Sequence, residues 1–300
     1  MNLKDFEYVK AIAQYKHFRK AADACFVSQP TLSGQVKKLE HELGVTLFDR
    51  STKQVTLTAK GERLLTQIEI ILEQTQILKE LAATSNEPLQ GKLTIGIIPT
   101  IAPYLLPALL TSMKAAFIDS QFSFIEMQTA TILEALNNGE LDFAILADVP
   151  ELINYHTVAL YKEDFLVAVS QDNALSKHKK VALSDLQGCS LLMLSDGHCF
   201  KDQAQKFCFS AGVDVSNQYK GNSLETLLAL VAMDDGITFV PKLACTDRVG
   251  IDYLPIFPNQ QRNVVFACRK HYPHLSGVEQ LGEWLSAHPN LKAKLTKDLG

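Results

Sequence analysis

The strongest constraint in this 300-residue sequence is the pattern of its first sixty residues. Apolar side chains recur at helical spacing in three successive segments: Leu3 to Tyr15, Phe18 to Cys25, and a third that Ser28 can cap and Gly44 can end. Only the pair Phe26-Val27 separates the second segment from the third. A short helix, a tight turn and a capped third helix together predict a helix-turn-helix.

The third helix has one apolar and one polar face, as expected of a helix that reads the major groove of DNA. Glutamine and serine side chains can bond base edges, and basic side chains can neutralise phosphates. The expected DNA-binding residues are Arg19, Ser28, Gln29, Pro30, Thr31, Ser33, Lys37, Lys38, Arg50 and Lys53. Residues 48–57 alternate like a hairpin, so a winged helix-turn-helix domain is expected over residues 1–58. The alternative is an ordinary three-helix core with a solvated charged face.

The charge distribution supports a nucleic-acid partner for the head of the chain. The formal net charge is −4, but residues 1–66 hold 11 basic and 7 acidic side chains, a net of +4. Residues 67–90 have a net charge of −3 and residues 91–300 a net charge of −5. A basic head on an acidic body is typical of a DNA-binding module joined to a second domain.

A single long helix is expected next, from Thr58 to about Ala83, within a linker and hinge at residues 59–90. Its apolar positions alternate in steps of four and three, which predicts a dimer seam. The seam consists of Leu64, Ile68, Ile71, Thr75 and Leu78. The alternative is a long helix that packs on its own domain. Pairing of two chains would present two reading helices to a roughly palindromic site on double-stranded DNA.

Residues 91–300 alternate between strand and helix patterns, which predicts an α/β domain with parallel sheets and ligand sites at the carboxyl ends of the strands. The expected strands are residues 92–98, 121–128, 143–147, 157–160, 165–170, 190–194, 237–240 and 264–268. The expected helices are residues 103–116, 132–136, 199–211, 278–287 and one that Ser223 caps and that reaches Met233.

The sequence lacks the common enzyme motifs: it has no dinucleotide fingerprint, P-loop, zinc-protease motif or nucleophile elbow. We therefore expect no enzyme, no cofactor and no metal site. None of the six cysteines forms a C-x-x-C pair, and Cys25, Cys189, Cys245 and Cys268 lack activating neighbours. Cys199 differs, because it follows a strand, the turn Asp196-Gly197 and His198. A helix amino terminus and an imidazole would both lower its pKa and favour a nucleophilic thiolate.

A thiolate attacks peroxide to give a sulfenic acid, which condenses with a second thiol. Cys208 is the nearest downstream cysteine, nine residues on. Nine helical residues rise about 13 Å, whereas a disulfide needs Cα atoms within about 7 Å. The bond therefore requires the segment to rearrange, which would make it a two-state switch. The alternative is that Cys208, between Phe207 and Phe209, is a buried core residue.

The head resembles the LysR-type transcriptional regulators over about sixty residues. The resemblance rests on Phe18-Arg19-Lys20-Ala21-Ala22, Val27-Ser28-Gln29-Pro30-Thr31-Leu32-Ser33, Leu47-Phe48-Asp49-Arg50 and Leu57-Thr58-Ala59-Lys60-Gly61. It implies a body of two hinged subdomains like a periplasmic binding protein. Subdomain I would comprise about residues 91–162 and 269–300, and subdomain II about residues 163–268. The resemblance also implies that the protein forms a tetramer and that RNA polymerase is one of its partners.

The body resembles the hydrogen-peroxide sensors of that family. The motifs are Asp196-Gly197-His198-Cys199, Phe207-Cys208-Phe209 and Ser223-Leu224-Glu225-Thr226-Leu227. This resemblance implies that Cys199 is the peroxidatic cysteine and Cys208 the resolving one. It also implies that Thr100, Thr129, His198 and Asp202 hold peroxide or its water. For Thr100 and Thr129, the alternative is that strand-end hydroxyls bond the local backbone.

The leading hypothesis is a homo-oligomeric transcription regulator of antioxidant genes that peroxide switches through Cys199. A second hypothesis is a LysR-type regulator that binds a small organic effector, and a third is a thiol peroxidase with an added DNA module. The heptad seam and the lack of a second active-site motif argue against the third. The acidic amphipathic start and the lack of a spanning apolar run predict a cytoplasmic protein without a membrane partner.

Overall fold

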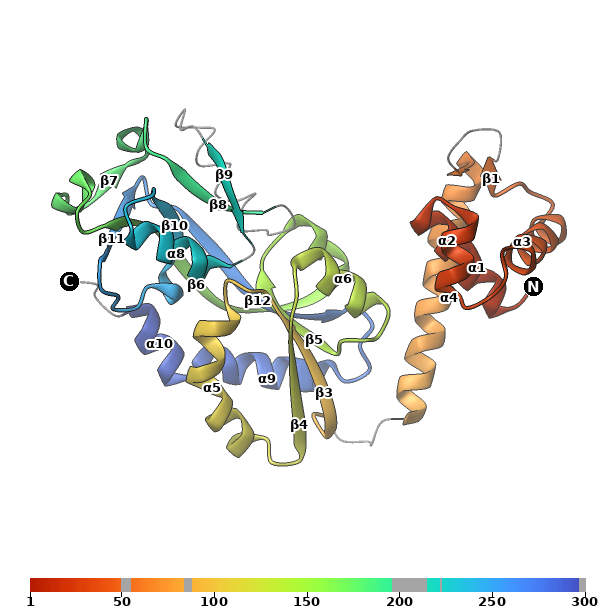
Figure 1. Ribbon diagram of the computed structural model, residues 1–300. Helices are drawn as coiled ribbons and strands as arrows, with labels where there is room; N and C mark the ends of the chain where they lie inside the picture. Colours follow the sequence, from red (N-terminus) through yellow and green to blue (C-terminus); the bar gives the residue numbers. More distant parts are fainter. Residues whose placement is uncertain (50–54, 84–87, 196–214, 222, 297–300) are drawn as a thin grey trace. The chain divides into compact units, whose positions relative to one another are not determined.

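The computed structural model describes residues 1–49, 55–83, 88–195, 215–221 and 223–296. The chain forms two compact units, Met1–Thr84 and Ser85–Gly300, which we call the head unit and the regulatory unit. Figure 1 shows the helices and strands of each unit. Among the described residues, no helix is both long enough and apolar enough to cross a membrane.

The head unit contains the three expected helices and a small hairpin. Its elements are α1 (Leu3–Tyr15), α2 (Phe18–Ala24), α3 (Gln29–Leu43), β1 (Phe48–Asp49), β2 (Thr56–Leu57) and α4 (Ala59–Ala83). Asn2 and Asp5 form a capping box at the start of α1, and Ser28 caps α3 by accepting from the Thr31 amide. Gly44 ends α3 in the left-handed region at φ 66°, a conformation that suits glycine. Local caps therefore fix these helix boundaries.

Helix α4 begins where the sequence predicts, because the Thr58 hydroxyl accepts from the Gly61 amide at 2.9 Å. The first half of the expected dimer seam packs against the head unit's own core. Ile68 is buried there, and Leu64 and Ile71 pack beside it. Leu78, one turn past Thr75, is 67% exposed. The seam is thus divided, and the pairing of two chains stays a prediction.

The regulatory unit carries a mixed sheet with helices packed on it. Its described strands are β3 (Gly91–Ile97), β4 (Ser120–Glu126), β5 (Phe143–Ala147), β6 (Tyr155–Ser170), β7 (Val181–Ala182), β8 (Leu191–Leu194), β9 (Val215–Gly221), β10 (Thr238–Pro241), β11 (Ile251–Phe257) and β12 (Gln261–Arg269). Its described α-helices are α5 (Ala102–Ala116), α6 (Thr129–Asn137), α8 (Leu224–Ala232), α9 (Leu275–Ala287) and α10 (Pro289–Thr296).

The strand order is β4-β3-β5-β12-β6-β11-β7, with β10 also paired to β6, and β8 pairs with β9 separately. The expectation of parallel sheets holds for β3 with β4 and β5, and for β8 with β9. It is wrong for the centre, where β12 runs antiparallel to β5 and β6, and β10 and β11 run antiparallel to β6. Strand–helix alternation is lost there, since no α-helix lies between β10, β11 and β12.

Strand β6 is one continuous element, although the sequence predicted two strands at 157–160 and 165–170. Its first part, Tyr155–Asp164, pairs with β12, and from Phe165 onward it pairs with β10 and β11. Figure 1 shows β6 and β12 side by side through the middle of the regulatory unit. The polar stretch at Lys162, Glu163 and Asp164 lies at this change of partner and does not end the strand.

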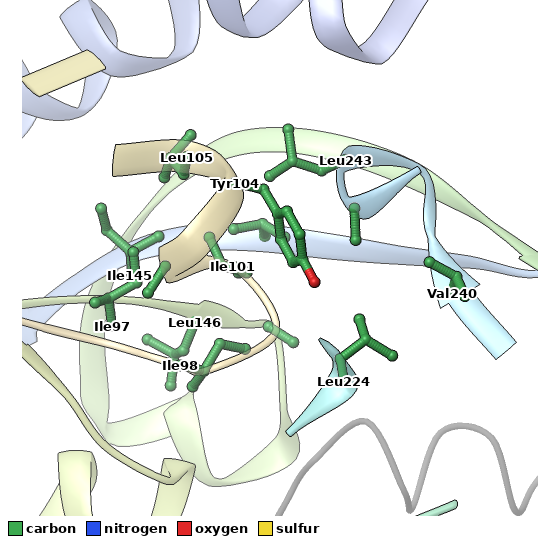
Figure 2. Packing of buried hydrophobic residues seen from close by; sticks show 14 of the residues in the cluster. Ile97, Ile98, Ile101, Tyr104, Leu105, Ile145, Leu146, Leu224, Val240 and Leu243 are labelled. Atoms are coloured by element: carbon green, nitrogen blue, oxygen red, sulfur yellow. The ribbon is translucent and has the colours of Figure 1, made fainter. Parts of the chain in front are cut away.

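One apolar core runs through the regulatory unit from α5 to α8 and η4 (Lys242–Ala244). Figure 2 shows Tyr104 of α5 among these apolar side chains, close to Leu243 of η4 and Leu224 of α8. Strand β11 and helix α10 were not predicted from the sequence. Ser223 stands at the amino end of α8 as expected, but its side chain makes no capping hydrogen bond.

Candidate functional site

Helix α3 presents the predicted polar face to solvent. Leu32, Val36 and Leu39 are buried in the head unit's core, whereas Gln29, Pro30, Thr31, Lys37 and Lys38 are exposed and Ser33 is half-buried. Arg19, near the start of α2, is exposed as well. The Ser28 hydroxyl is already engaged, because it lies 2.7 Å from Thr31 Oγ1 and caps the helix. These residues form a polar surface at the amino end of a helix, which suits a DNA groove.

The hairpin is held to α3 by one carboxylate. Glu40 Oε1 accepts from the Leu47 amide at 2.8 Å and from the Phe48 amide at 3.3 Å. Glu40 follows the buried Leu39 in α3, so the hairpin is attached to the same helix that carries the polar face. This attachment gives the β1–β2 hairpin the place of a wing beside the reading helix.

Several predicted site residues lie outside the described residues: Arg50 and Lys53 of the wing, and His198, Cys199, Asp202 and Cys208 of the predicted redox segment. The expected helix over residues 199–211 lies outside them as well. Of the predicted peroxide-binding residues, the structure describes Thr100 and Thr129.

Thr100 and Thr129 lie at the same edge of the sheet. Thr100 comes three residues after β3 ends, and Thr129 comes three residues after β4 ends. The two strands are parallel and Ile97 pairs with Glu126, so their carboxyl ends coincide. Thr100 is 2% exposed and Thr129 is 9% exposed, and the Thr129 hydroxyl has no hydrogen-bond partner among the described residues. The fold thus brings two buried threonines that are distant in sequence to the same sheet edge.

A buried ion pair adjoins Thr100. Arg262 Nε and Nη2 donate to Glu163 Oε1 at 2.9 and 2.8 Å, and both side chains are fully buried. The Arg262 guanidinium also reaches Thr100, with Nη1 at 3.0 Å from the hydroxyl oxygen and Nη2 at 3.3 Å from the carbonyl oxygen. The other Glu163 oxygen accepts from the Leu243 amide at 2.7 Å. The cluster therefore links β6, β12, η4 and the segment between β3 and α5.

Sequence reasoning missed Arg262 and Glu163. Glu163 lies between the two strands expected at residues 157–160 and 165–170, and Arg262 lies just before the strand expected at residues 264–268. The signal that could have identified these two residues is their position directly beside a strongly apolar strand pattern. A charged residue in such a position needs a partner when the strand is buried on both faces.

The four cysteines that the sequence separated from the redox pair have raised pKa values. Burial raises the pKa of the Cys189 thiol, and burial with the nearby Glu7 raises that of Cys25. Burial raises the pKa of Cys268 to about 12, and burial with Glu163 raises that of Cys245 well above its usual range. These groups are protonated at neutral pH, and a thiol is a poor nucleophile compared with a thiolate.

A second polar cluster lies at the start of α8. The Tyr104 hydroxyl donates to Glu225 Oε1 at 2.6 Å, and Arg248 donates to both Glu225 oxygens at 2.7 Å. Burial, together with the hydrogen bond to Glu225, raises the pKa of Tyr104 well above its usual range, so its hydroxyl remains a donor. No group of His, Cys, Asp and Glu side chains in the described part of the chain could hold a metal ion.

Two family models match the chain. Residues 3–62 match the bacterial regulatory helix-turn-helix protein of the lysR family, and residues 86–290 match the LysR substrate binding domain. The first covers α1 to α3, the hairpin and the start of α4, and the second covers most of the regulatory unit.

Relatives of known name match almost the full length. The DNA-binding transcriptional dual regulator OxyR of Escherichia coli K12 is 43% identical over 291 residues, which is 96% of this chain and 95% of that protein. Full-length OxyR from Pseudomonas aeruginosa is a similar solved structure, with a TM-score of 0.66, 32% identity and 99% of each chain covered. A hydrogen-peroxide-bound OxyR mutant from Corynebacterium glutamicum has a TM-score of 0.65 and 31% identity, with 98% of this chain and 94% of that chain covered.

Proposed function

This chain belongs to the LysR family of transcriptional regulators and, within it, to the OxyR group, and on that premise we propose that hydrogen peroxide switches it by oxidising Cys199. The Cys199 thiolate attacks one peroxide oxygen, the O–O bond breaks, and the departing hydroxide takes a proton and becomes water. Cys199 is then a sulfenic acid. The Cys208 thiol attacks that sulfur, a disulfide forms, and a second water leaves. A cellular dithiol reductant restores the two thiols.

The observation that carries this proposal is the meeting of Thr100 and Thr129 at one sheet edge. Breaking the O–O bond places negative charge on the leaving oxygen, and preorganised donors stabilise such charge. Two buried hydroxyls, one of them without a partner among the described residues, supply such donors. His198 would add an imidazole, and Asp202 would link to that network. A similar OxyR structure from Corynebacterium glutamicum is bound to hydrogen peroxide, which supports peroxide as the ligand proposed here.

The four other cysteines support the assignment by contrast. Their thiols have raised pKa values and are half-buried or buried. Peroxide reacts with thiolates, so these four sites should react slowly at neutral pH. The chemistry is then concentrated on Cys199 and Cys208, to which the resemblance to the hydrogen-peroxide sensors assigns the peroxidatic and resolving roles.

The switch acts on the binding of promoter DNA by the head unit. Helix α3 enters the major groove with Gln29 and Ser33 at base edges, and Lys37, Lys38 and Arg19 contact phosphates. Two chains pair through the exposed part of the linker helix around Leu78, and two such dimers form a tetramer. The rearranged oligomer then contacts RNA polymerase at antioxidant genes.

Mass spectrometry after stoichiometric peroxide tests the chemical step. We expect a Cys199–Cys208 disulfide in the wild-type chain and a persistent sulfenic acid at Cys199 in Cys208→Ser. Cys189→Ser is the matched control and should behave like wild type, because that thiol has a raised pKa. If Cys199→Ser leaves peroxide-dependent transcription unchanged, the proposal is wrong.

A second candidate is a regulator that binds a small organic effector. The match of residues 86–290 to the LysR substrate binding domain favours it. It predicts that a small molecule changes the DNA footprint of the fully reduced protein, and that Cys199→Ser retains this change. A footprint that responds to peroxide alone supports the first proposal.

A further inference from the structure

The carboxylate of Glu163 is fully buried and is linked to Thr100 through Arg262. Its Oε1 accepts two hydrogen bonds from Arg262, and its Oε2 accepts one from the Leu243 amide. Both charged side chains are fully buried. Burial of two charges is unfavourable unless their geometry and hydrogen bonds compensate, and three bonds of 2.7–2.9 Å do so here. Glu163 therefore fixes the position of the Arg262 guanidinium.

The fixed guanidinium determines how Thr100 can act. An arginine side chain has only donors, so the Thr100 hydroxyl oxygen must be the acceptor of the 3.0 Å bond from Arg262 Nη1. The hydroxyl proton of Thr100 is then directed away from Arg262. A second bond, from Nη2 to the Thr100 carbonyl at 3.3 Å, holds the backbone at the same place. Thr100 is thus arranged as a donor toward another group.

We propose that Glu163 is a positioning residue of the peroxide site, because its hold on Arg262 makes the Thr100 hydroxyl a fixed donor to the leaving oxygen of peroxide. The inference rests on the proposed function, since it assumes that Thr100 faces the peroxide. Glu163 does not touch the peroxide, and its effect passes through Arg262 and Thr100. When the O–O bond breaks, the leaving oxygen gains charge, and a donor already in place requires no reorganisation.

Glu163→Gln is the direct test. The glutamine has the same shape, but its amide nitrogen must face either Arg262 or the Leu243 amide, and both are donors. Arg262 then shifts. We expect the rate constant for the reaction of the Cys199 thiolate with hydrogen peroxide to fall by about 100-fold. A misplacement of about 1 Å can cause a loss of this size.

The reaction of Cys199 with iodoacetamide separates positioning from thiolate chemistry. Both rate constants are measured across pH to their plateaus, where Cys199 is fully a thiolate. Because alkylation involves no peroxide oxygen, its plateau should stay near the wild-type value in Glu163→Gln. Equal losses in both plateaus would indicate a general distortion and overturn the inference. An unchanged peroxide plateau would overturn it as well.

Variants at Thr100 provide a second test of the inference. Thr100→Val removes the hydroxyl, and we expect Glu163→Gln to add no further loss in that background, because the two residues act through one donor. Additive losses would contradict the mechanism. Thr100→Ser should restore most of the peroxide rate constant. If Glu163→Gln does not fold, Glu163→Asp keeps the charge and should show a smaller loss confined to the peroxide plateau.

Glu225→Gln is the matched control, since Glu225 also accepts from an arginine in the regulatory unit, but among the described residues that arginine, Arg248, makes no hydrogen bond to Thr100. Both of its plateaus should equal those of wild type. The failure of the proposed function is a different result, in which the wild-type protein and Cys199→Ser consume peroxide at the same rate. A Cys199-dependent reaction that Glu163→Gln leaves unchanged overturns only the positioning role.

Discussion

Two arginine–carboxylate pairs in the regulatory unit connect to the same short segment of chain, and they differ in burial. Arg262 and Glu163 lie 2.8 Å apart with both side chains fully buried, and their cluster reaches Thr100. Arg248 and Glu225 lie 2.7 Å apart with side chains 27% and 43% exposed, and their cluster reaches Tyr104. Bond length is nearly the same in the two pairs. Solvent access is the difference.

That difference separates what each pair can do. A buried pair gives little net stability when intact, but breaking it leaves one charge without compensation. A partly exposed pair can replace its partner with water, so its loss is small. The buried pair is therefore suited to fixing one geometry, and the exposed pair to a modest adjustable contact. Four mutations test this contrast.

The largest effect is expected for Arg262→Met. The Glu163 carboxylate would stay buried, and the Leu243 amide would be its one remaining donor among the described residues. We expect the free energy of unfolding of the regulatory unit to fall by about 3–5 kcal/mol. The chain has one tryptophan, Trp284 in α9 of that unit, so its fluorescence during denaturant unfolding reports this unit.

The double variant Arg262→Met with Glu163→Gln is the control. It removes both charges and keeps an acceptor for the Leu243 amide, so most of the lost stability should return. A loss below about 1 kcal/mol in the single variant would place the buried pair with surface pairs and break the comparison.

Tyr104→Phe is expected to have the next largest effect. It removes a 2.6 Å hydrogen bond to the Glu225 carboxylate and leaves the apolar contacts of the ring in place. Hydrogen bonds to charged groups contribute about 1.5–3 kcal/mol when protected. Glu225 is partly exposed, so we expect a loss of about 1–2 kcal/mol in the same fluorescence measurement.

Tyr155→Phe is a matched comparison, because the Tyr155 hydroxyl donates to the neutral oxygens of Leu133 and Asn137. Its loss should be smaller, about 0.5–1.5 kcal/mol. An equal or larger loss in Tyr155→Phe would show that the charge on Glu225 adds nothing to the Tyr104 bond.

The sequence predicted the head unit better than the regulatory unit for a physical reason. The helices of the head are set by local patterns, such as the buried stripe Leu32, Val36 and Leu39 in α3 and the caps at Ser28 and Gly44. Each pattern spans fewer than twenty residues and acts within one element. Neighbouring residues therefore carry most of the information.

The centre of the regulatory sheet depends on pairings between distant segments. Lys162, Glu163 and Asp164 lie between the two expected strands, but Glu163 pairs with Arg262 of β12 and β6 continues through them. Thr100 and Arg262 meet across 162 residues of sequence. No local pattern encodes that register, so the partner of a buried charge could not be identified before the fold was known.

The predicted site divides in the same way. The resemblance pointed to Thr100 and Thr129, and the structure brings both to one sheet edge. The resemblance did not point to Arg262 or Glu163, and a single sequence does not show which charged side chains become buried. The roles of His198, Cys199, Asp202 and Cys208 stay predictions that the oxidation experiment addresses.

Arg248→Met should have a small effect that depends on salt. The pair is partly exposed, so we expect a loss of less than about 1 kcal/mol in unfolding free energy. Raising the ionic strength from about 0.15 to 1 M shortens the Debye length from about 8 to 3 Å and should reduce that loss further. The loss in Arg262→Met should stay constant in the same series. If both losses shrink equally with salt, burial is not what distinguishes the pairs.

The smallest expected effect is a pH dependence at Glu225. Burial pushes the pKa of this carboxyl up, but the hydrogen bonds from Arg248 and Tyr104 outweigh it and hold the pKa below its ordinary value. The folded pKa is thus lower than the unfolded value of about 4.3. The contribution of the ionised carboxylate is present above the unfolded pKa and is lost as the pH falls through the folded pKa. The stability difference between wild type and Glu225→Gln should therefore be constant from neutral pH to about pH 5.5 and should shrink below about pH 4.3. Unfolding followed by Trp284 fluorescence at each pH measures this difference. A difference that grows on acidification would show that the cost of burying the carboxylate outweighs the two hydrogen bonds.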